Sequence, residues 1–131
     1  MNRTMTRKEI GDFGERKAVT YLRLRGYTVK ERNWVSGKCE IDIIAATLKD
    51  LVFVEVKTRT YEESSWKDAP PPGLAVHADK QTYTRRAAQD YLRRHPTKKQ
   101  PRMDVIEVWL SKEADGKRPK VLKIHHIKAA Y

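Results

Sequence analysis

The spacing of hydrophobic and polar positions predicts alternating helices and strands along the chain. An apolar face with helical periodicity covers residues 7–25. It lies between a capping-box pattern that begins at Thr6 and a glycine, Gly26, where a helix commonly ends. We therefore expect a first helix there, followed by a short strand that ends near residues 32–34.

Two runs rich in β-branched residues form the centre of the predicted sheet. Residues 38–46 and 51–57 are separated only by the short segment 47–50, a spacing that is typical of an antiparallel hairpin. After Arg59 the alternation is lost and the composition becomes acidic and then proline-rich. This change predicts a flexible loop near residues 60–75.

The second half of the chain repeats the alternation of helix and strand. A helical apolar face covers residues 78–94, and strand patterns follow near 102–110 and 120–127, with a turn at Asp115-Gly116. The predicted order is α-β-β-β-α-β-β. It indicates one α/β domain over residues 1–131, in which two helices flank a mixed central sheet.

Charge narrows the class of partner. The 131 residues include 28 Lys and Arg against 17 Asp and Glu, a formal net charge of +11. Such an excess favours a polyanionic partner, and DNA, ribosomal RNA or an anionic membrane surface would each fit. The single cysteine, Cys39, excludes an intrachain disulfide and a thiolate-rich zinc site. No stretch has the length and apolarity of a membrane span or a signal sequence, so we expect a cytoplasmic protein without a membrane anchor.

Charged residues in the two central runs suggest chemistry. Because side chains alternate between the faces of a strand, Glu55 and Lys57 share one face. If the hairpin closes symmetrically, Asp42 lies opposite Glu55 and Glu40 lies opposite Lys57, with Cβ atoms roughly 5 Å apart. Two carboxylates at that separation repel each other, and a divalent cation relieves the repulsion.

The residue types suit phosphodiester hydrolysis. Mg²⁺ or Mn²⁺ prefers oxygen ligands, which Asp42, Glu55 and the backbone carbonyl of Val56 would supply. Lys57 would orient the attacking water or stabilise the charge that develops on the phosphorus centre. Acid and base residues opposed on an exposed strand face also form ordinary cross-strand ion pairs, and the pattern alone leaves both interpretations open.

A series of short motifs extends over nearly the whole chain: Phe13-Gly14-Glu15, Asn33-Trp34, Glu40-Ile41-Asp42-Ile43-Ile44-Ala45, Phe53-Val54-Glu55-Val56-Lys57-Thr58-Arg59, Lys80-Gln81, Arg102-Met103-Asp104-Val105 and Ala129-Ala130-Tyr131. In this order the motifs resemble the YraN-like family of bacterial proteins classed as endonucleases. That family is similar to archaeal Holliday-junction resolvases and belongs to the PD-(D/E)XK restriction-endonuclease-like superfamily. The chain departs from the family pattern at Cys39, where glycine is usual, and at Met103, where an aromatic residue is usual.

The resemblance implies a restriction-endonuclease-like α-β-β-β-α-β core. It implies a catalytic set of Asp42, Glu55 and Lys57, with Glu15 on the first helix as a fourth acid. Glu15 falls at the edge of that helix's apolar face, which suits either a reach over the sheet or simple solvation. By analogy with resolvases, a homodimer is expected.

Other charged or polar residues have two interpretations each. Glu40 is either a carboxylate supporting the metal site or the ion-pair partner of Lys57. Three residues are candidates to contact nucleic acid or to support the site. Arg59 follows the strand that carries Glu55 and Lys57, and Lys80 and Gln81 begin the second helix. Simple surface solvation explains Lys80 and Gln81 equally well.

Together these features predict a metal-dependent nuclease that hydrolyses phosphodiester bonds in DNA rather than RNA. As the resolvase resemblance implies, its substrates would be branched or single-stranded structures in DNA repair or recombination. Two alternatives remain at this stage. One is a nucleic-acid-binding module with a nuclease-like fold and no turnover, and the other is a basic RNA- or ribosome-associated protein.

Overall fold

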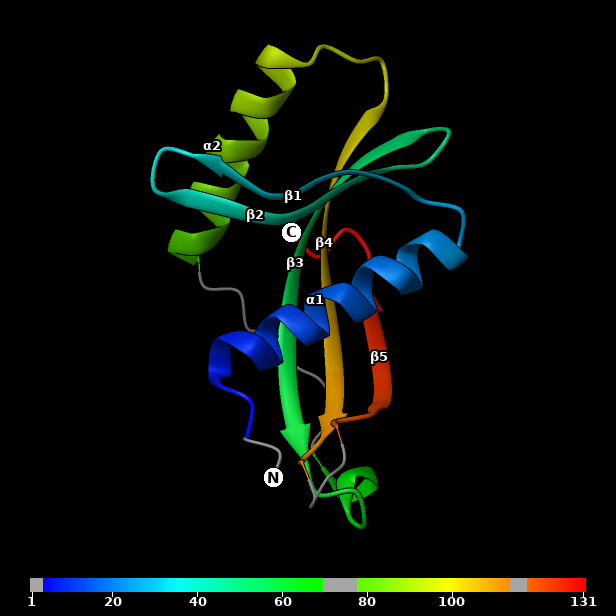
Figure 1. The fold of residues 1–131 in the computed structure, drawn as a ribbon. Coiled ribbons are helices and arrows are strands. Elements are labelled where there is room, and N and C mark those ends of the chain that lie inside the picture. The colour runs from blue at the N-terminus through cyan, green and yellow to red at the C-terminus, as the bar shows by residue number, and fades with distance from the viewer. Residues whose placement is uncertain (1–3, 70–77, 114–117) are drawn as a thin grey trace.

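The computed structural model describes residues 4–69, 78–113 and 118–131 (Figure 1). Within these ranges the elements are α1 (Arg7–Leu24), β1 (Thr28–Ser36), β2 (Cys39–Ala46), β3 (Asp50–Tyr61), the short 3₁₀ helix η1 (Trp66–Asp68), α2 (Ala78–Arg94), β4 (Gln100–Ser111) and β5 (Val121–Ile127). No helix in these ranges is long and apolar enough to cross a membrane.

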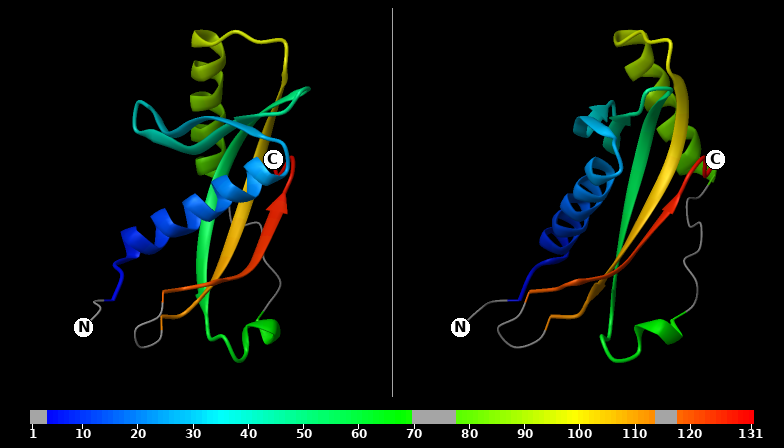
Figure 2. Two further views of the ribbon diagram at one scale, coloured as in Figure 1. Left: turned by 45° about the vertical axis from the view of Figure 1, so that its right-hand side comes forward. Right: turned by 90° about the vertical axis from the view of Figure 1, so that its right-hand side faces the viewer.

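The strands form one mixed sheet in the order β1-β2-β3-β4-β5, in which β3 and β4 are parallel and the other neighbours are antiparallel. The two helices cover opposite faces of the sheet (Figures 1 and 2). The predicted α/β class, the order of elements and the mixed sheet with flanking helices are confirmed.

Two predicted strands are longer in the structure. β1 continues to Ser36, where it meets Cys39 across a tight hairpin. β3 continues to Tyr61 because its polar last residues pair in parallel register with β4. Backbone hydrogen bonds to β4 hold these residues in a strand although their sequence lacks a hydrophobic pattern. The predicted loop therefore starts after Tyr61, and its residues 70–75 lie outside the described residues, as does the predicted turn at Asp115-Gly116.

Each face of the sheet has its own hydrophobic core. Between α1 and the sheet lies a cluster of Phe13, Ala18, Val19, Leu22, Tyr27, Ile43, Ala45, Val52, Val54, Ile106, Val108 and Leu110. Beneath α2 lies a second cluster of Ile41, Ile44, Ala46, Leu51, Phe53, Ala87, Ala88, Tyr91 and Met103. Successive residues of β3 thus alternate between the two cores, which assigns Glu55 and Lys57 to the α2 face.

β2 and β3 separate halfway along their length. Their pairing starts next to the turn, with Ala46 opposite Leu51, as symmetric closure of the hairpin predicts. Among the described residues the pairing ends at Ile43 opposite Val54, so Asp42, the next residue away from the turn, is not paired with β3. Beyond that point β2 remains paired only with β1, and a seam opens between β2 and β3.

The separation corrects both predicted oppositions. Asp42 is not paired with Glu55, because the β2–β3 register among the described residues ends at Ile43 and Val54. Glu40 lies opposite Val35 of β1 rather than opposite Lys57. Lys57 lies in register with Glu107 of β4, because β3 keeps its parallel partner through Tyr61. The symmetric register fails here because the Asp42 side chain, not the β2 backbone, accepts the next hydrogen bond from β3.

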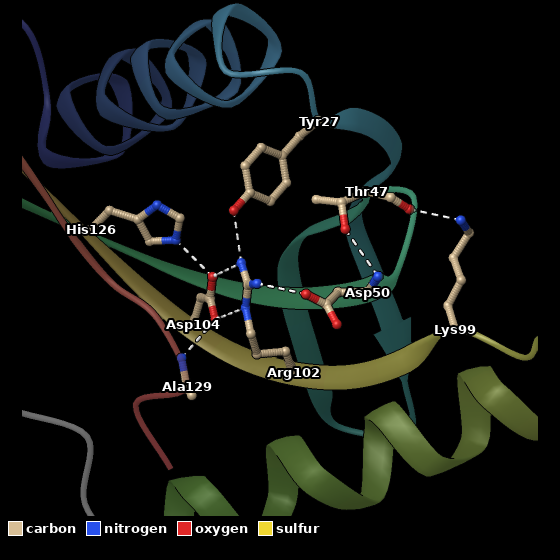
Figure 3. A network of polar contacts seen from close by, with 8 residues as sticks. All are labelled: Tyr27, Thr47, Asp50, Lys99, Arg102, Asp104, His126 and Ala129. Carbon is tan, nitrogen blue, oxygen red and sulfur yellow. Dashed lines mark hydrogen bonds and ion pairs between the residues drawn. The ribbon is translucent and has the colours of Figure 1, made fainter.

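A buried ionic network ties the β3–β4–β5 half of the sheet together (Figure 3). Asp104, fully buried on β4, accepts two hydrogen bonds from Arg102, each 2.9 Å long, and one of 3.0 Å from the backbone of Ala129. His126 Nε2 lies 2.6 Å from the same carboxylate. Arg102 also donates to Asp50 and to the Tyr27 hydroxyl, so every charged group of the network has a partner.

Candidate active site

Asp42 lies at the seam where β2 leaves β3. Its Oδ2 accepts a hydrogen bond of 2.8 Å from the backbone N–H of Val56. Burial raises the pKa of Asp42 to about 6 from the ordinary 3.8, and the hydrogen bond from Val56 only partly opposes this shift. The negative charges of Glu15 and Glu55 raise the pKa further.

Glu55 has one satisfied and one unsatisfied oxygen. Its side chain is 11% exposed, and Oε1 forms an ion pair of 2.7 Å with Lys80 Nζ from the first turn of α2. Oε2 is buried and has no hydrogen-bond partner among the described residues. A buried carboxylate oxygen without a donor is costly, so this atom marks a position that a cation or a donor would stabilise.

Lys80 is held in its charged form. Burial lowers the pKa of this amine, but the hydrogen bond to Glu55 and the charges of Glu55 and Asp42 outweigh that effect, so the pKa is raised. Lys80 was predicted as a residue that supports the site or contacts nucleic acid, and the structure places its ammonium 2.7 Å from Glu55 Oε1.

Glu15 reaches the seam from α1. The residue before it, Gly14, packs directly on β3, since a Cβ atom there would lie 2.1 Å from Oγ1 of Thr58. This close approach buries Glu15, which raises its pKa, while Arg32 and Asn33 of β1 oppose the shift. The Arg32 Nη2 atom lies 3.4 Å from Glu15 Oε1.

Val56 and Lys57 are placed by the geometry of β3. The N–H and C=O groups of one strand residue point to the same side, so the Val56 carbonyl faces the seam as its N–H does. Lys57 is half-buried and shares the α2 face with Glu55. Val56 thus contacts Asp42 through its backbone N–H, and Lys57 lies two residues from Glu55 on the same face of β3.

The remaining candidates lie further out. Glu40 is exposed, and its charge contributes to the raised pKa of Glu15. Arg59 forms a long ion pair of 3.8 Å with Glu107 and also borders the pocket beside Asp42. Gln81 is half-buried on α2, next to Lys80.

A divalent cation fits this donor set. Among the residues that the structure describes, no group of three or more Asp, Glu, His or Cys side chains forms a ready-made metal cage. Mg²⁺ does not need one, because it is commonly held by one or two carboxylates, a carbonyl, water and substrate phosphate. Two features of the site are consistent with binding a cation: one Glu55 oxygen has no partner among the described residues, and the pKa of Asp42 is raised.

Sequence reasoning missed several residues around the site. Glu107 is buried, and one of its oxygens has no partner within the described ranges. Its in-register position beside Lys57 follows only from the parallel pairing of β3 and β4. Arg32 and Asn33 approach Glu15 because β1 is irregular, with Asn33 at a φ of 52°. Asparagine tolerates that conformation, which was the one available signal.

The site residues fall within a known family pattern. The model of the family described as "Uncharacterised protein family UPF0102" matches residues 14–108, a range that contains every candidate ligand and Lys80. A UPF0102 protein of Caldicellulosiruptor saccharolyticus is 35% identical over 128 residues, which cover 97% of this chain and 100% of the relative. A UPF0102 protein of Porphyromonas gingivalis is 41% identical over 108 residues, covering 82% of this chain and 76% of the relative. These matches agree with the YraN-like resemblance of the motifs.

Proposed function

This chain belongs to the UPF0102 family, and we propose that it is a Mg²⁺- or Mn²⁺-dependent nuclease that hydrolyses phosphodiester bonds in DNA. The observation that carries the proposal is the pair of crowded carboxylates at the seam. Asp42 is partly buried beside two other acids, and Glu55 keeps a buried oxygen without a partner among the described residues. Both features cost folding free energy, and both become favourable when positive charge and phosphate arrive.

The ligands would be Asp42, Glu55 and the carbonyl of Val56. A bound Mg²⁺ or Mn²⁺ would polarise the phosphoryl oxygen and lower the pKa of a coordinated water. Asp42 is preorganised for this role, because its Oδ2 is fixed by the Val56 N–H. Glu55 is fixed through Oε1 by Lys80, which leaves Oε2 for a new partner.

Lys57 and Glu15 would act next to these ligands. Lys57 shares a strand face with Glu55, and its ammonium would stabilise the developing charge or orient the water. Glu15 enters from the opposite helix, and Arg32 keeps its carboxylate in place. A half-buried cation and acids from both sides of the sheet thus surround the position of the scissile phosphate.

The overall charge supports a nucleic-acid substrate. A net charge of +11 would steer polyanions to the molecule, so binding should weaken steeply as salt is raised. The preference for branched or single-stranded DNA, a role in repair or recombination and action as a homodimer are parts of the proposal that rest on the resemblance to resolvases.

One observation favours a second candidate function, a nucleic-acid-binding module without turnover. Lys80 already neutralises Glu55 at 2.7 Å, so the site holds a positive charge without metal. For such a module, DNA binding would be sensitive to salt and indifferent to divalent cations and to loss of Lys57.

The test is cleavage of end-labelled single-stranded, duplex, flap and four-way-junction DNA, with RNA as competitor, in Mn²⁺, Mg²⁺ or EDTA. Asp42→Asn and Lys57→Ala should each lower the cleavage rate by about 100-fold or more. Glu62→Gln and Lys98→Ala, which change an exposed acid and an exposed lysine, serve as matched controls and should cut normally. Metal-independent binding without cleavage would instead support the binding module, and equal activity of all variants would refute the proposed site.

A further inference from the structure

A pocket of about 650 Å³ lies between α1 and the end of β3. Glu15, Asp42 and Val56 line it where it joins the candidate active site, and Arg7 and Lys8 line it at the start of α1. Eight residues of helix separate Glu15 from Arg7, a length of about 12 Å. The pocket therefore connects the site carboxylates to two basic side chains.

One wall of the pocket is a strand edge. β3 pairs with β2 only as far as Val54, but with β4 as far as Tyr61. In the described part of the chain, the edge of β3 that faces away from β4 therefore has no neighbouring strand after Val54. The N–H of Val56 points to that side, and by the two-residue period those of Thr58 and Thr60 do so too. Both threonines line the pocket.

The opposite wall contains a glycine that packing does not explain. Gly14 must be glycine because Thr58 fills the space of a Cβ atom, but a Cβ at Gly11 would meet no atom of the described residues within 4 Å. Glycine in a helix interior is less stable than alanine, so Gly11 weakens α1 without a structural benefit. Gly11 lines the pocket, and a side chain larger than a methyl group at this position would extend over it.

We propose that this pocket binds an extended single strand of nucleic acid, with its phosphates towards Arg7 and Lys8 and its scissile bond at the carboxylates. The inference rests on the proposed function and adds the path of its substrate. A pocket of about 650 Å³ between one helix and one strand has room for a short extended chain. Arg7 and Lys8 line the pocket at the start of α1 together with Asp12, which lies 3.9 Å from Lys8 Nζ. The net charge of +11 favours a polyanion over an extended peptide, which is the other ligand that a strand edge accepts.

The first test fills the pocket. Binding of a fluorescent single-stranded oligonucleotide is measured by anisotropy in EDTA, so that neither metal nor cleavage contributes. Leucine in a helix points back towards the N-terminus, so the side chain of Gly11→Leu would lie over the pocket mouth. We expect about tenfold weaker binding by Gly11→Leu, which corresponds to about 1.4 kcal/mol.

Two controls separate blocking from unfolding. Gly11→Ala should bind as wild type and raise the thermal midpoint by about 3–5 °C. Thr20→Leu puts the same side chain on an exposed position of α1 outside the pocket and should leave binding unchanged. Wild-type affinity of Gly11→Leu would overturn the inference, as would preferential binding of an extended peptide over the oligonucleotide.

The second test asks whether a positive charge in the pocket contributes more to binding than a positive charge elsewhere on α1. Arg7→Gln and Arg23→Gln each remove one positive charge from α1, but only Arg7 lines the pocket. Arg7→Gln should weaken binding several-fold more and reduce the salt dependence by about one ion. Equal effects would mean that net charge alone attracts the strand, which would overturn the inference. Because these assays contain no metal, they can show strand binding in the pocket even if cleavage is never observed. If the protein is an active nuclease and Gly11→Leu binds as wild type, the proposed substrate path is refuted and the proposed function is not.

Discussion

Asp42 and Asp104 are carboxylates of the same sheet, on β2 and β4, in opposite circumstances. Asp104 accepts hydrogen bonds from Arg102 and Ala129 and contacts His126 at 2.6 Å. Burial alone would raise the pKa of Asp104, but these partners outweigh it, so the pKa is lowered. Asp42 accepts one backbone hydrogen bond beside two other acids, and its pKa is raised to about 6.

The difference distinguishes a carboxylate that stabilises the fold from one that the fold tolerates. A buried ion is stable only when its lost hydration is replaced, and Asp104 receives that replacement from its own chain. Asp42 does not, so its ionised form carries a free-energy cost that another molecule could relieve. Asp104 is fully buried and Asp42 partly buried, so the more buried acid has the lower pKa; the count and charge of their partners explain this difference.

The largest expected effect comes from removing the charge of Asp104. Asp104→Asn removes the charge that pairs with Arg102 and contacts His126 in a fully buried position, and leaves Asp50 as the remaining anionic partner of Arg102. We therefore expect the free energy of unfolding to fall by about 3–5 kcal/mol. Urea denaturation at pH 7.5 measures the change. If the variant does not fold, Arg102→Lys keeps the charge but loses the paired hydrogen bonds and should show a smaller loss. Wild-type stability of both variants would contradict a structural role for the network.

The same substitution at Asp42 should have the opposite sign. Asp42→Asn removes an ionised carboxylate that is partly buried near two other acids, and the amide oxygen can still accept the Val56 hydrogen bond. We expect the metal-free protein to become more stable by about 1–3 kcal/mol at pH 7.5 while it loses cleavage. The matched control is Glu62→Gln, an exposed acid whose loss should change stability by about 0.5 kcal/mol or less. A destabilised Asp42→Asn protein would mean that Asp42, like Asp104, is chiefly structural.

The stabilisation by Asp42→Asn should also depend on pH. A carboxyl whose pKa is raised from 3.8 to about 6 binds its proton more tightly in the folded state, so its contribution to stability falls as pH rises between these values. The difference between Asp42→Asn and wild type should therefore shrink from about 3 kcal/mol at most at pH 7.5 to about 1 kcal/mol at pH 4.5. Denaturation of both proteins at the two pH values measures it. A difference that stays constant with pH would show that the charge of Asp42 is not its cause.

Most of the fold could be predicted from the sequence because its signals are local. The capping box at Thr6 is present, and the two predicted helices match α1 and α2 to within one residue at each end. The polar end of β3, from Thr58 to Tyr61, could not be recognised, because its strand conformation depends on the non-local pairing with β4.

The candidate site was predictable in its residue types but not in its contacts. The spacing of Glu55 and Lys57 placed them on one face, and the symmetric hairpin held as far as Ile43. The seam at Asp42 arises because one side chain replaces a backbone acceptor, and no periodic pattern encodes that exchange. The role of Asp104 was missed for a similar reason: Arg102 two residues before it was a signal, but His126 comes from a distant strand.

The smallest expected effect concerns the cations that pair with a carboxylate in each region, Lys80 with Glu55 and Arg102 with Asp104. Arg102 is mostly buried and binds Asp104 through two nitrogens, whereas the Lys80 side chain is 55% exposed and contacts Glu55 once. We therefore expect Lys80 to be displaceable, and Lys80→Gln to lower stability by only about 1 kcal/mol. Without the ammonium at Oε1, a divalent cation has less competition, so Lys80→Gln should bind Mn²⁺ several-fold more tightly.

A Mn²⁺ titration followed by the thermal midpoint measures this affinity, since a ligand that binds only the folded state raises the midpoint with concentration. Glu55→Gln should abolish the Mn²⁺-dependent rise, and Lys98→Gln, which removes an exposed lysine elsewhere, should leave it unchanged. If Lys80→Gln weakens Mn²⁺ binding as Glu55→Gln does, Lys80 supports the metal site rather than competing with it. The pair of Lys80 and Glu55 would then resemble the pair of Arg102 and Asp104. The contrast between the candidate active site and the Asp104 network would rest on Asp42 alone.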